Sequence, residues 1–316
     1  MTTTPLDYGL PPSGYRLPEA THIGGVRLQV RELQRSLDYY TGIIGLRVVE
    51  RGADSAALAA HGDDRPLVRL HAVPGTQPVP RRGVFGLYHF AILLPDRASL
   101  GRFVTHLATV GVRAGAADHL VSEALYLTDP DGLGIEIYAD RPKSTWRHAQ
   151  RELAMASDPL DFAAVAAAAH GEPWTGAPAG TTMGHVHLHV GDLDIARRFY
   201  HDALGLDVTV WSYPGALFFA AGGYHHHLGT NTWSPGPAAT DSQARLLDWE
   251  LLLPRSEDAA AAAHSLMAAG YPAAPDGAVW TATDPWGTRV VLRVVLRLVL
   301  LCQIDEFLNG FGSDHF

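Results

Sequence analysis

Gly184-His185-Val186-His187-Leu188-His189-Val190 places three histidines at alternate positions of a short apolar segment. Successive side chains of a β-strand point to opposite faces of a sheet, so the histidines would share one face and the apolar residues the other. We expect the apolar face to pack on a helix and the histidine face to line a cleft. The turn Asp192-Leu193 follows directly and predicts the start of that helix.

The same pattern occurs 160 residues earlier in the chain, where Val30-Arg31-Glu32-Leu33 corresponds to Val190-Gly191-Asp192-Leu193. Each copy reads as a strand, an acidic-Leu turn, a short helix with apolar residues at helical spacing, a glycine where the helix would end, and a second strand. The further matching pairs are Tyr40 and Tyr200, and Gly45 and Gly205.

Two weaker repeats complete a set of four units. Residues 91–95 resemble residues 250–254, and about 40 residues later the turn Asp129-Pro130-Asp131-Gly132 resembles Asp284-Pro285-Trp286-Gly287. Proline and glycine at these positions are typical of turns between strands. The sequence therefore predicts four units with the order strand–helix–strand–strand–strand, here called modules one to four: residues 20–75, 85–140, 181–234 and 246–296.

The composition is that of a globular protein. Of the 316 residues, 47% are apolar and 18% are charged, which excludes a disordered chain and a coiled coil. The net charge of −9 without a basic block argues against a nucleic-acid partner. The longest apolar run, residues 290–301, is short and contains two arginines, so no membrane span is expected. A single cysteine, Cys302, and an N-terminus unlike a signal peptide favour a cytoplasmic protein.

The four-module pattern resembles the vicinal oxygen chelate superfamily, which includes glyoxalase I, bleomycin-resistance proteins and type I extradiol dioxygenases. It is most like bacterial two-domain catechol 2,3-dioxygenases, and the resemblance covers nearly the whole chain apart from its tails and linker. The most specific segments are residues 87–91, 118–126, 134–138, 184–190 and 223–229. The resemblance implies an α+β fold in which four βαβββ modules form two open mixed-sheet barrels around a divalent metal.

The expected division of the chain follows the repeats. Residues 19–140 would form one domain of this superfamily, with modules one and two, and residues 181–296 a second, with modules three and four. Residues 1–18 are expected to be extended. Residues 141–180 form a helical linker, in which Asp158-Pro159 predicts the start of a helix that continues to Ala169. Residues 297–316 form a C-terminal tail without an assigned function.

The resemblance places metal ligands on the first strands of the modules and a carboxylate on a last strand. In modules two and three these positions hold His89 and His185, and the last strand of module two holds Glu136. Two imidazoles and a carboxylate are typical of non-heme Fe(II) oxygen chemistry, and Mn(II) accepts the same ligands. The corresponding residues of modules one and four, which cannot make the same site, are Gly25, Asp248 and Val291.

The distribution of these residues also predicts how the modules pair. Pairing one with two and three with four would separate the ligands, whereas pairing two with three and one with four would unite them in one chain. A rival site between modules one and two would use His22. His22 lies three residues before the ligand position, and this odd offset would turn it to the opposite face of a regular strand.

The same resemblance implies acid–base groups beside the metal. Extradiol dioxygenases have a histidine and a tyrosine before their carboxylate ligand, and His119 and Tyr126 lie 17 and 10 residues before Glu136. A further catalytic histidine is expected about 40 residues after His185, where His225-His226-His227 is found. The family's His-His-x-Leu pattern favours His226, although strand alternation alone does not choose among the three.

Other polar residues near these positions are expected to bind substrate or to support the catalytic groups. Trp233 could border the cleft, but a tryptophan at this point is more often a core residue. The expected supporting residues are His187, His225, His227, Tyr138 and Asn231.

The resemblance therefore implies an extradiol ring-cleaving dioxygenase that inserts both atoms of O2 into a catechol-type substrate. His119 and Tyr126 would hydrogen-bond the diol oxygens, and His226 would donate a proton to oxygen. One alternative is a metal-dependent isomerase or lyase similar to glyoxalase I. Another is a sequestering protein similar to bleomycin-resistance proteins, which would not need Glu136, His119 and Tyr126 together. The expected partners are a small aromatic diol and O2, and the chain could form a homo-oligomer.

Overall fold

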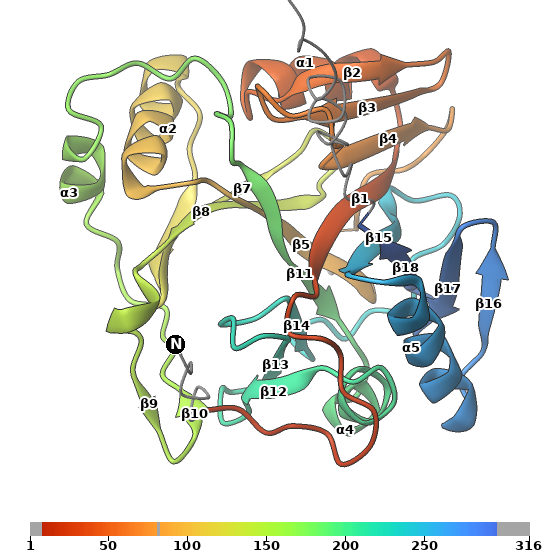
Figure 1. Cartoon of the computed structure of the whole chain (residues 1–316). Helices are drawn as coiled ribbons and strands as arrows, with labels where there is room; N and C mark the ends of the chain where they lie inside the picture. The colour runs from red at the N-terminus through yellow and green to blue at the C-terminus, as the bar shows by residue number, and fades with distance from the viewer. Residues whose placement is uncertain (1–7, 81–82, 296–316) are drawn as a thin grey trace, which may run out of the picture.

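The computed structural model describes residues 8–80 and 83–295. Each module has the predicted order of strand, helix and three strands (Figure 1). The elements of modules one and two are β1 (His22–Val30), α1 (Leu33–Gly42), β2 (Arg47–Arg51), β3 (Ser55–Ala59), β4 (Val68–Ala72), β5 (Gly86–Leu93), α2 (Arg97–Val110), β6 (Gly115–Asp118), β7 (Ser122–Thr128) and β8 (Gly134–Asp140). Those of modules three and four are β11 (Thr182–His189), α4 (Leu193–Arg197), the π-helical η2 (Arg198–Ala203), β12 (Asp207–Val210), β13 (Ala216–Ala220), β14 (Leu228–Asn231), β15 (Arg245–Leu253), α5 (Ser256–Ala268), β16 (Ala273–Asp276), β17 (Val279–Thr283) and β18 (Arg289–Val294).

Two eight-stranded mixed sheets hold the four modules. One has the order β12-β13-β14-β11-β5-β8-β7-β6 and joins modules three and two, while the other, β16-β17-β18-β15-β1-β4-β3-β2, joins modules four and one. In both, the first strands of the two modules lie antiparallel at the centre, and each pairs in parallel with the last strand of its own module. Each sheet therefore contains strands from both halves of the chain, 19–140 and 181–296.

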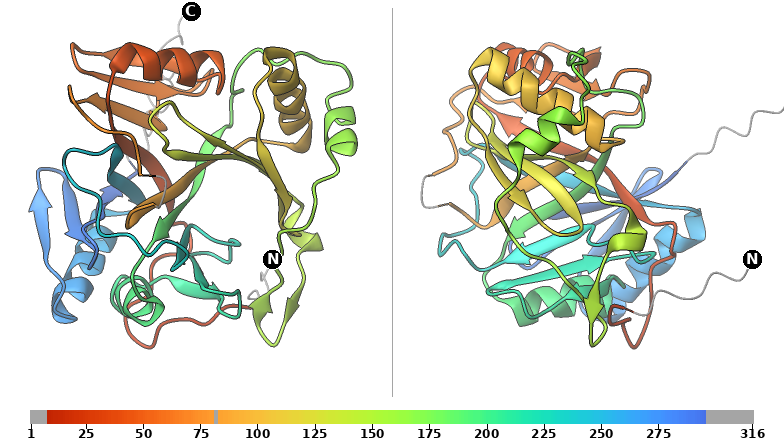
Figure 2. Two further views of the ribbon diagram at one scale, coloured as in Figure 1. Left: turned by 180° about the vertical axis from the view of Figure 1, so that it is seen from behind. Right: turned by 90° about the vertical axis from the view of Figure 1, so that its left-hand side faces the viewer.

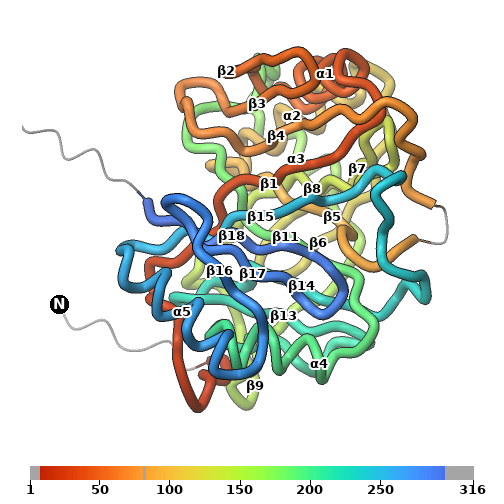
Figure 3. Tube along the Cα trace, turned by 90° about the vertical axis from the view of Figure 1, so that its right-hand side faces the viewer, coloured from red at the N-terminus to blue at the C-terminus, as the bar shows by residue number. Residues whose placement is uncertain are grey.

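The sheet of modules two and three curls around an interior space, and the helices lie on the outside of the molecule (Figure 1). Its central strands β5 and β11 cross the middle of the molecule, where β11 lies next to β1 of the other sheet (Figure 2). Figure 3 shows the side that is at the right in Figure 1, where β15 and β18 lie above α5 and contact it. The predicted fold class, α+β with four βαβββ modules, is confirmed.

The core lies between the sheets and their helices. Val186, Leu188 and Val190 are completely buried in it, as the alternation in β11 predicts. Tyr40 on α1 and Tyr200 on η2 occupy equivalent buried positions. Burial of one large apolar side chain contributes about 1.5–3 kcal/mol, so this face of β11 is fixed toward the helix. The histidines of β11 consequently face the inside of the curled sheet.

Local signals begin and end the repeated helices. The side chain of Asp192 caps α4 by accepting a hydrogen bond from the Ile195 amide, whereas Glu32, at the same position before α1, makes no such bond. Gly45 and Gly205 have φ angles of +81° and +98°, a region that favours glycine. They turn the chain from the helix into the second strand, as their spacing predicts.

The linker contains less helix than the sequence predicts. Its helix α3 (Phe162–Ala167) begins three residues after Pro159, because the side chain of Asp161 caps it by accepting a backbone hydrogen bond. Asp158 instead makes two backbone hydrogen bonds with Asp118. The rest of the linker holds elements that the sequence did not indicate: η1 (Lys143–Thr145), β9 (His148–Ala149) and β10 (Glu152–Leu153).

The N-terminal segment packs against module three. Leu10 exchanges backbone hydrogen bonds with Val208, and Arg16 forms an ion pair of 2.6 Å with Asp207. The predicted tail at 297–316, with Cys302, lies outside the described residues. In the described part of the chain, no helix is long and apolar enough to cross a membrane.

Candidate functional site

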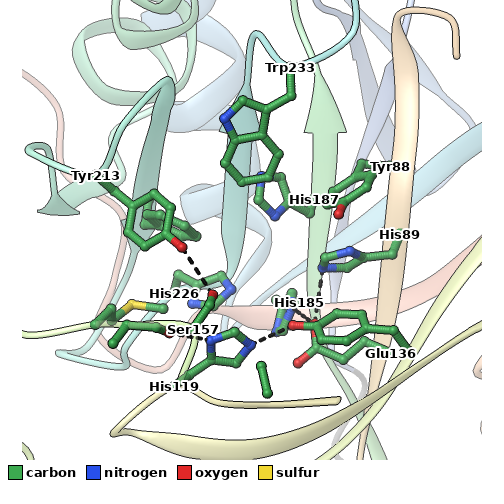
Figure 4. A pocket seen from close by; sticks show the side chains of 15 residues that line it. Tyr88, His89, His119, Glu136, Ser157, His185, His187, Tyr213, His226 and Trp233 are labelled. Atoms are coloured by element: carbon green, nitrogen blue, oxygen red, sulfur yellow. Dashed lines mark hydrogen bonds and ion pairs between the residues drawn. The ribbon is translucent and has the colours of Figure 1, made fainter. Parts of the chain in front are cut away.

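Three side chains of modules two and three meet inside the curled sheet (Figure 4). His89 on β5, Glu136 on β8 and His185 on β11 are all buried. Nε2 of each histidine lies 3.1 Å from Oε2 of Glu136, and the potential ligand atoms of all three are within 4.8 Å of one another. The register explains the meeting, because Ala91 of β5 pairs with His185 on one side and with Glu136 on the other. The small side chain of Ala91 leaves the space between them open.

The chemistry of these three residues fits a divalent metal ion. Burial lowers the pKa of His89 and of His185, so both imidazoles are neutral. Burial alone would raise the pKa of Glu136, but His185 and His89 bring that pKa well below its usual value. Nε2 of His89 is buried and makes a 3.1 Å ion-pair contact with Oε2 of Glu136, but the geometry is not that of a hydrogen bond. Metal binding requires neutral imidazoles and an ionised carboxylate, and a bound ion would give Nε2 of His89 the well-aligned partner that it lacks.

A cavity of about 230 Å³ opens beside these three side chains (Figure 4). Its walls come from modules two and three and from the linker, so a ligand inside it would contact all three parts of the chain. The other lining residues are Tyr88, Ala117, His119, Tyr126, Met155, Ala156, Ser157, His187, Tyr213, Phe218, His226 and Trp233.

His119 and Tyr126 form a hydrogen-bonded pair at the cavity wall. Nδ1 of His119 lies 2.6 Å from the carbonyl oxygen of Ala156, and Nε2 lies 2.5 Å from the hydroxyl of Tyr126. A carbonyl only accepts, so Nδ1 carries the proton of a neutral ring and Nε2 accepts from the tyrosine. Burial, together with the nearby charge of Glu136, raises the pKa of Tyr126 well above 10, so its hydroxyl stays a donor.

The three consecutive histidines have three different surroundings. His226 lines the cavity, with its ring centre 4.1 Å from that of His185. Burial lowers the pKa of His226 well below 6.5. His225 lies behind it, in hydrogen-bond contact with Asp140. Nδ1 of His227 accepts from a backbone amide, and His227 is not among the lining residues.

The remaining expected residues support the cavity rather than line it, apart from His187. Nε2 of His187 lies 3.0 Å from the side-chain nitrogen of Asn231, which orients it. The ring of Tyr138 packs against His185 at 5.1 Å between ring centres. Gly184 makes this contact possible, because a Cβ atom there would lie 1.7 Å from the hydroxyl oxygen of Tyr138.

Several residues that line the cavity were not predicted from the sequence, because they belong to no repeat or motif. Met155 and Ser157 belong to the linker, which is not repeated, and Tyr213 lies in a loop after β12. The expectation of a core tryptophan is wrong, because Trp233 lines the cavity and is 45% exposed. Tyr88 directly precedes the candidate ligand His89 in the sequence, and this position next to a ligand is the signal that could have identified it.

The rival residue His22 is exposed on β1, where its Nδ1 contacts the carbonyl oxygen of Ala20 at 2.9 Å. In the sheet of modules one and four, Asp248 is hydrogen-bonded to Arg27. Neither residue belongs to the group of His89, Glu136 and His185.

Comparison with known proteins gives matches in both sequence and structure. A model of the Glyoxalase/Bleomycin resistance protein/Dioxygenase superfamily matches residues 21–137 and 182–292. The catechol-2,3-dioxygenase of Bacillus subtilis (strain 168) is 45% identical over 258 residues, which cover 80% of this chain and 90% of that protein. The crystal structure of glyoxalase I from Zea mays has a TM-score of 0.51 at 18% identity, covering 86% of this chain and 92% of that one.

Proposed function

The chain belongs to the glyoxalase/bleomycin resistance protein/dioxygenase superfamily, and we propose that it is an extradiol ring-cleaving dioxygenase acting on a catechol-type substrate. The observation that carries the proposal is the group of His89, His185 and Glu136 beside a cavity that also holds acid–base side chains. The 45% identity to a catechol-2,3-dioxygenase supports it.

We infer that His89, His185 and Glu136 hold the metal and that this metal is Fe(II). Two imidazoles and one carboxylate leave positions free for other ligands, and this set is typical of Fe(II) oxygenases, although Mn(II) accepts it too. The bound ion would acidify the diol and supply the redox chemistry that O2 requires. Without an ion the two imidazoles are already neutral and the carboxylate ionised, which are the charge states that binding needs.

The side chains around the metal group have distinct roles in this proposal. Tyr126 and His119, which hydrogen-bond each other, face the diol oxygens and hold protons near them. His226 faces the cavity from the opposite module and serves as the acid–base group that moves a proton between the substrate and oxygen. His187, fixed by Asn231, contributes to the wall beside the ring.

The wall of the cavity favours an uncharged substrate ring. Its apolar part comes from Met155, Tyr213, Phe218 and Trp233, and its polar part from histidines, tyrosines and one serine. Among the described residues that line it there is no lysine or arginine to neutralise a carboxylate on the ring. We therefore infer that catechol and its apolar derivatives are preferred over catechols that carry a carboxylate.

The partners and the cellular location of the enzyme are inferred from its chemistry and net charge. The partners are a small aromatic diol and O2, and the net charge of −9 without a basic block gives no reason to expect nucleic acid. Extradiol ring cleavage needs reduced iron, which agrees with a cytoplasmic protein that carries a single cysteine.

The test is oxygen consumption by the full chain after anaerobic loading with Fe(II) or Mn(II). Catechol should be consumed with one O2 per molecule, giving a yellow ring-opened product of the hydroxymuconic semialdehyde type. Binding of catechol without oxygen uptake would instead support a sequestering protein, and isomerisation of a thiohemiacetal without oxygen uptake would support a glyoxalase-like enzyme. The matched variants are Glu136→Gln, which should be inactive, and Asp248→Asn in the other sheet, which should be active.

A further inference from the structure

A chain of hydrogen bonds runs from the cavity to a carboxylate outside it. Nδ1 of His226 lies 2.7 Å from Nδ1 of His225, and Nε2 of His225 lies 3.0 Å from Oδ1 of Asp140. His226 lines the cavity, His225 is completely buried, and the side chain of Asp140 is 26% exposed. None of these contacts involves the group of His89, His185 and Glu136.

The middle residue of this chain is held firmly. The hydroxyl of Thr209 donates to the backbone oxygen of His225 at 2.7 Å. The ring of His225 packs against those of Tyr224 and Trp146, with distances between ring centres of 4.0 and 5.4 Å. Its two nitrogens are therefore fixed toward their partners, one toward Asp140 and the other toward His226.

The direction of the hydrogen bonds follows from the carboxylate at the end of the chain. An ionised carboxylate only accepts, and Asp140 already accepts from the hydroxyl of Tyr224 at 3.3 Å. Nε2 of His225 must therefore donate to it. In a neutral His225, Nδ1 is then an acceptor, so Nδ1 of His226 must carry the proton. The remaining nitrogen of His226, Nε2, is left without a proton.

We propose that Asp140, acting through His225, holds His226 as the Nδ1-protonated tautomer and so presents an unprotonated Nε2 to the substrate. The proposal rests on the proposed function. The O–H bond of one catechol hydroxyl breaks, its proton goes to Nε2 and the electron pair stays on the oxygen. The imidazolium that forms then holds the proton which His226 later returns to an oxygen of the product. Asp140 and His225 are positioning residues, because neither lines the cavity.

The tautomer can be read directly by ¹⁵N NMR of the histidine side chains. Full-length protein labelled at the imidazole nitrogens is measured metal-free and with Zn(II), a diamagnetic ion, and His226 is assigned by its loss in His226→Gln. The expected spectrum has a protonated Nδ1 and an unprotonated Nε2 for His226. A protonated Nε2 with an unprotonated Nδ1 would overturn the proposal.

Substitution of the carboxylate tests the consequence. In Asp140→Asn the amide can donate to Nε2 of His225, which reverses both hydrogen bonds, so the population of the Nδ1-protonated form of His226 should fall. We expect kcat to fall roughly 10- to 10³-fold, with KM changed far less and metal content unchanged. This is less than the roughly 10⁴-fold loss for a carboxylate that contacts the catalytic histidine directly, because Asp140 acts through His225. Asp140→Glu should restore part of the kcat.

The control is Asp207→Asn, which removes another carboxylate from the same sheet, one that pairs with Arg16 and not with a histidine. It should leave kcat and the His226 spectrum unchanged. An Asp140→Asn enzyme with wild-type kcat and an unchanged His226 tautomer would refute the positioning role while leaving the proposed function intact. A wild-type protein that consumes no O2 with catechol would refute the proposed function. The NMR spectrum would still show which nitrogen of His226 carries the proton, because that measurement does not depend on turnover.

Discussion

The two eight-stranded sheets have the same strand order and register but different side chains at their centres. In the sheet of modules two and three, His187 pairs with His89, and at the same step of the other sheet Arg27 pairs with Asp248. Asp248 is thus the structural counterpart of His89. The same backbone supports a potential metal group in one sheet and charged pairs in the other.

The second sheet fills the equivalent space with hydrogen-bonded ions. Asp248 accepts from Arg27 at 2.8 Å, and Glu250 accepts from Arg293 at 2.9 Å. Glu250 takes the position that Ala91 leaves open in the first sheet, since each pairs with the strand that would carry the carboxylate ligand. The comparison teaches that the same backbone accepts two different sets of central side chains, so the fold itself does not require the group of His89, Glu136 and His185.

The largest difference between the sheets should appear on removal of a candidate ligand. His89→Ala, His185→Ala or Glu136→Gln should each reduce bound iron and turnover to background, because two remaining ligands cannot hold the ion in this geometry. Iron content is measured by elemental analysis after reconstitution. Asp248→Asn, the counterpart of His89, should retain both properties, and loss of iron in that variant would contradict the comparison.

The next effect concerns catalysis without loss of metal. His119→Ala removes the acceptor of the Tyr126 hydroxyl but no candidate ligand. Turnover should fall roughly 10²–10⁴-fold, the range for an acid–base group, while iron content stays at the wild-type level. If this variant no longer binds iron, His119 is itself a ligand and the assignment fails.

A smaller effect is expected for the ion pair of the second sheet. In Asp248→Asn, the half-exposed Arg27 regains water, so the loss of the pair should cost about 1 kcal/mol and lower Tm by a few degrees. Thermal unfolding of the metal-free protein measures it. A change in kcat at saturating catechol would show that the second sheet takes part in the reaction.

A pH-dependent effect on stability alone tests a feature that both halves share. The hydroxyl of Tyr40 donates to Asp129, as that of Tyr200 does to Asp284, and burial raises the pKa of Asp129 to about 6. The folded state therefore binds this proton more tightly than the unfolded state, whose pKa is about 3.9. Stability from this group is present below about pH 4 and is lost as the pH rises through about 6.

Asp129→Asn removes the titrating carboxyl and should therefore remove the loss of stability between about pH 4 and pH 6. Its free energy of unfolding, relative to the wild type, should therefore improve by ~1–3 kcal/mol between about pH 4 and pH 6. Denaturant unfolding at several pH values measures the difference, and iron binding at neutral pH should be unaffected. A difference that is constant over this interval would show that Asp129 has an ordinary pKa.

The sequence predicted the fold through its repeats. The alternation in 184–190 fixes which face of β11 packs toward the helix, and the matching spacing of Asp192 and Glu32 locates the helices of modules one and three. The helix of the linker was placed too early because Pro159 is compatible with a first turn, while the capping side chain is that of Asp161. Because the linker is not repeated, nothing in the sequence could decide between Pro159 and Asp161 as the marker of the helix start.

For the site, spacing located the residues that lie on strands. His89, Glu136 and His185 come together because the register brings three strands to Ala91. Residues contributed by irregular segments, such as Met155 and Tyr213, could not be found from periodicity, because their positions depend on how the linker and loops pack. Strand alternation also could not separate His225 from His226, since neither lies in a strand.

The most direct test is the location of iron in crystals of the reconstituted full chain, measured by anomalous diffraction at the iron edge. The account predicts one site per chain, roughly 2 Å from Nε2 of His89, Nε2 of His185 and a carboxylate oxygen of Glu136. An iron peak beside Asp248 in the second sheet, near His22, or bound by residues of two different chains would contradict it.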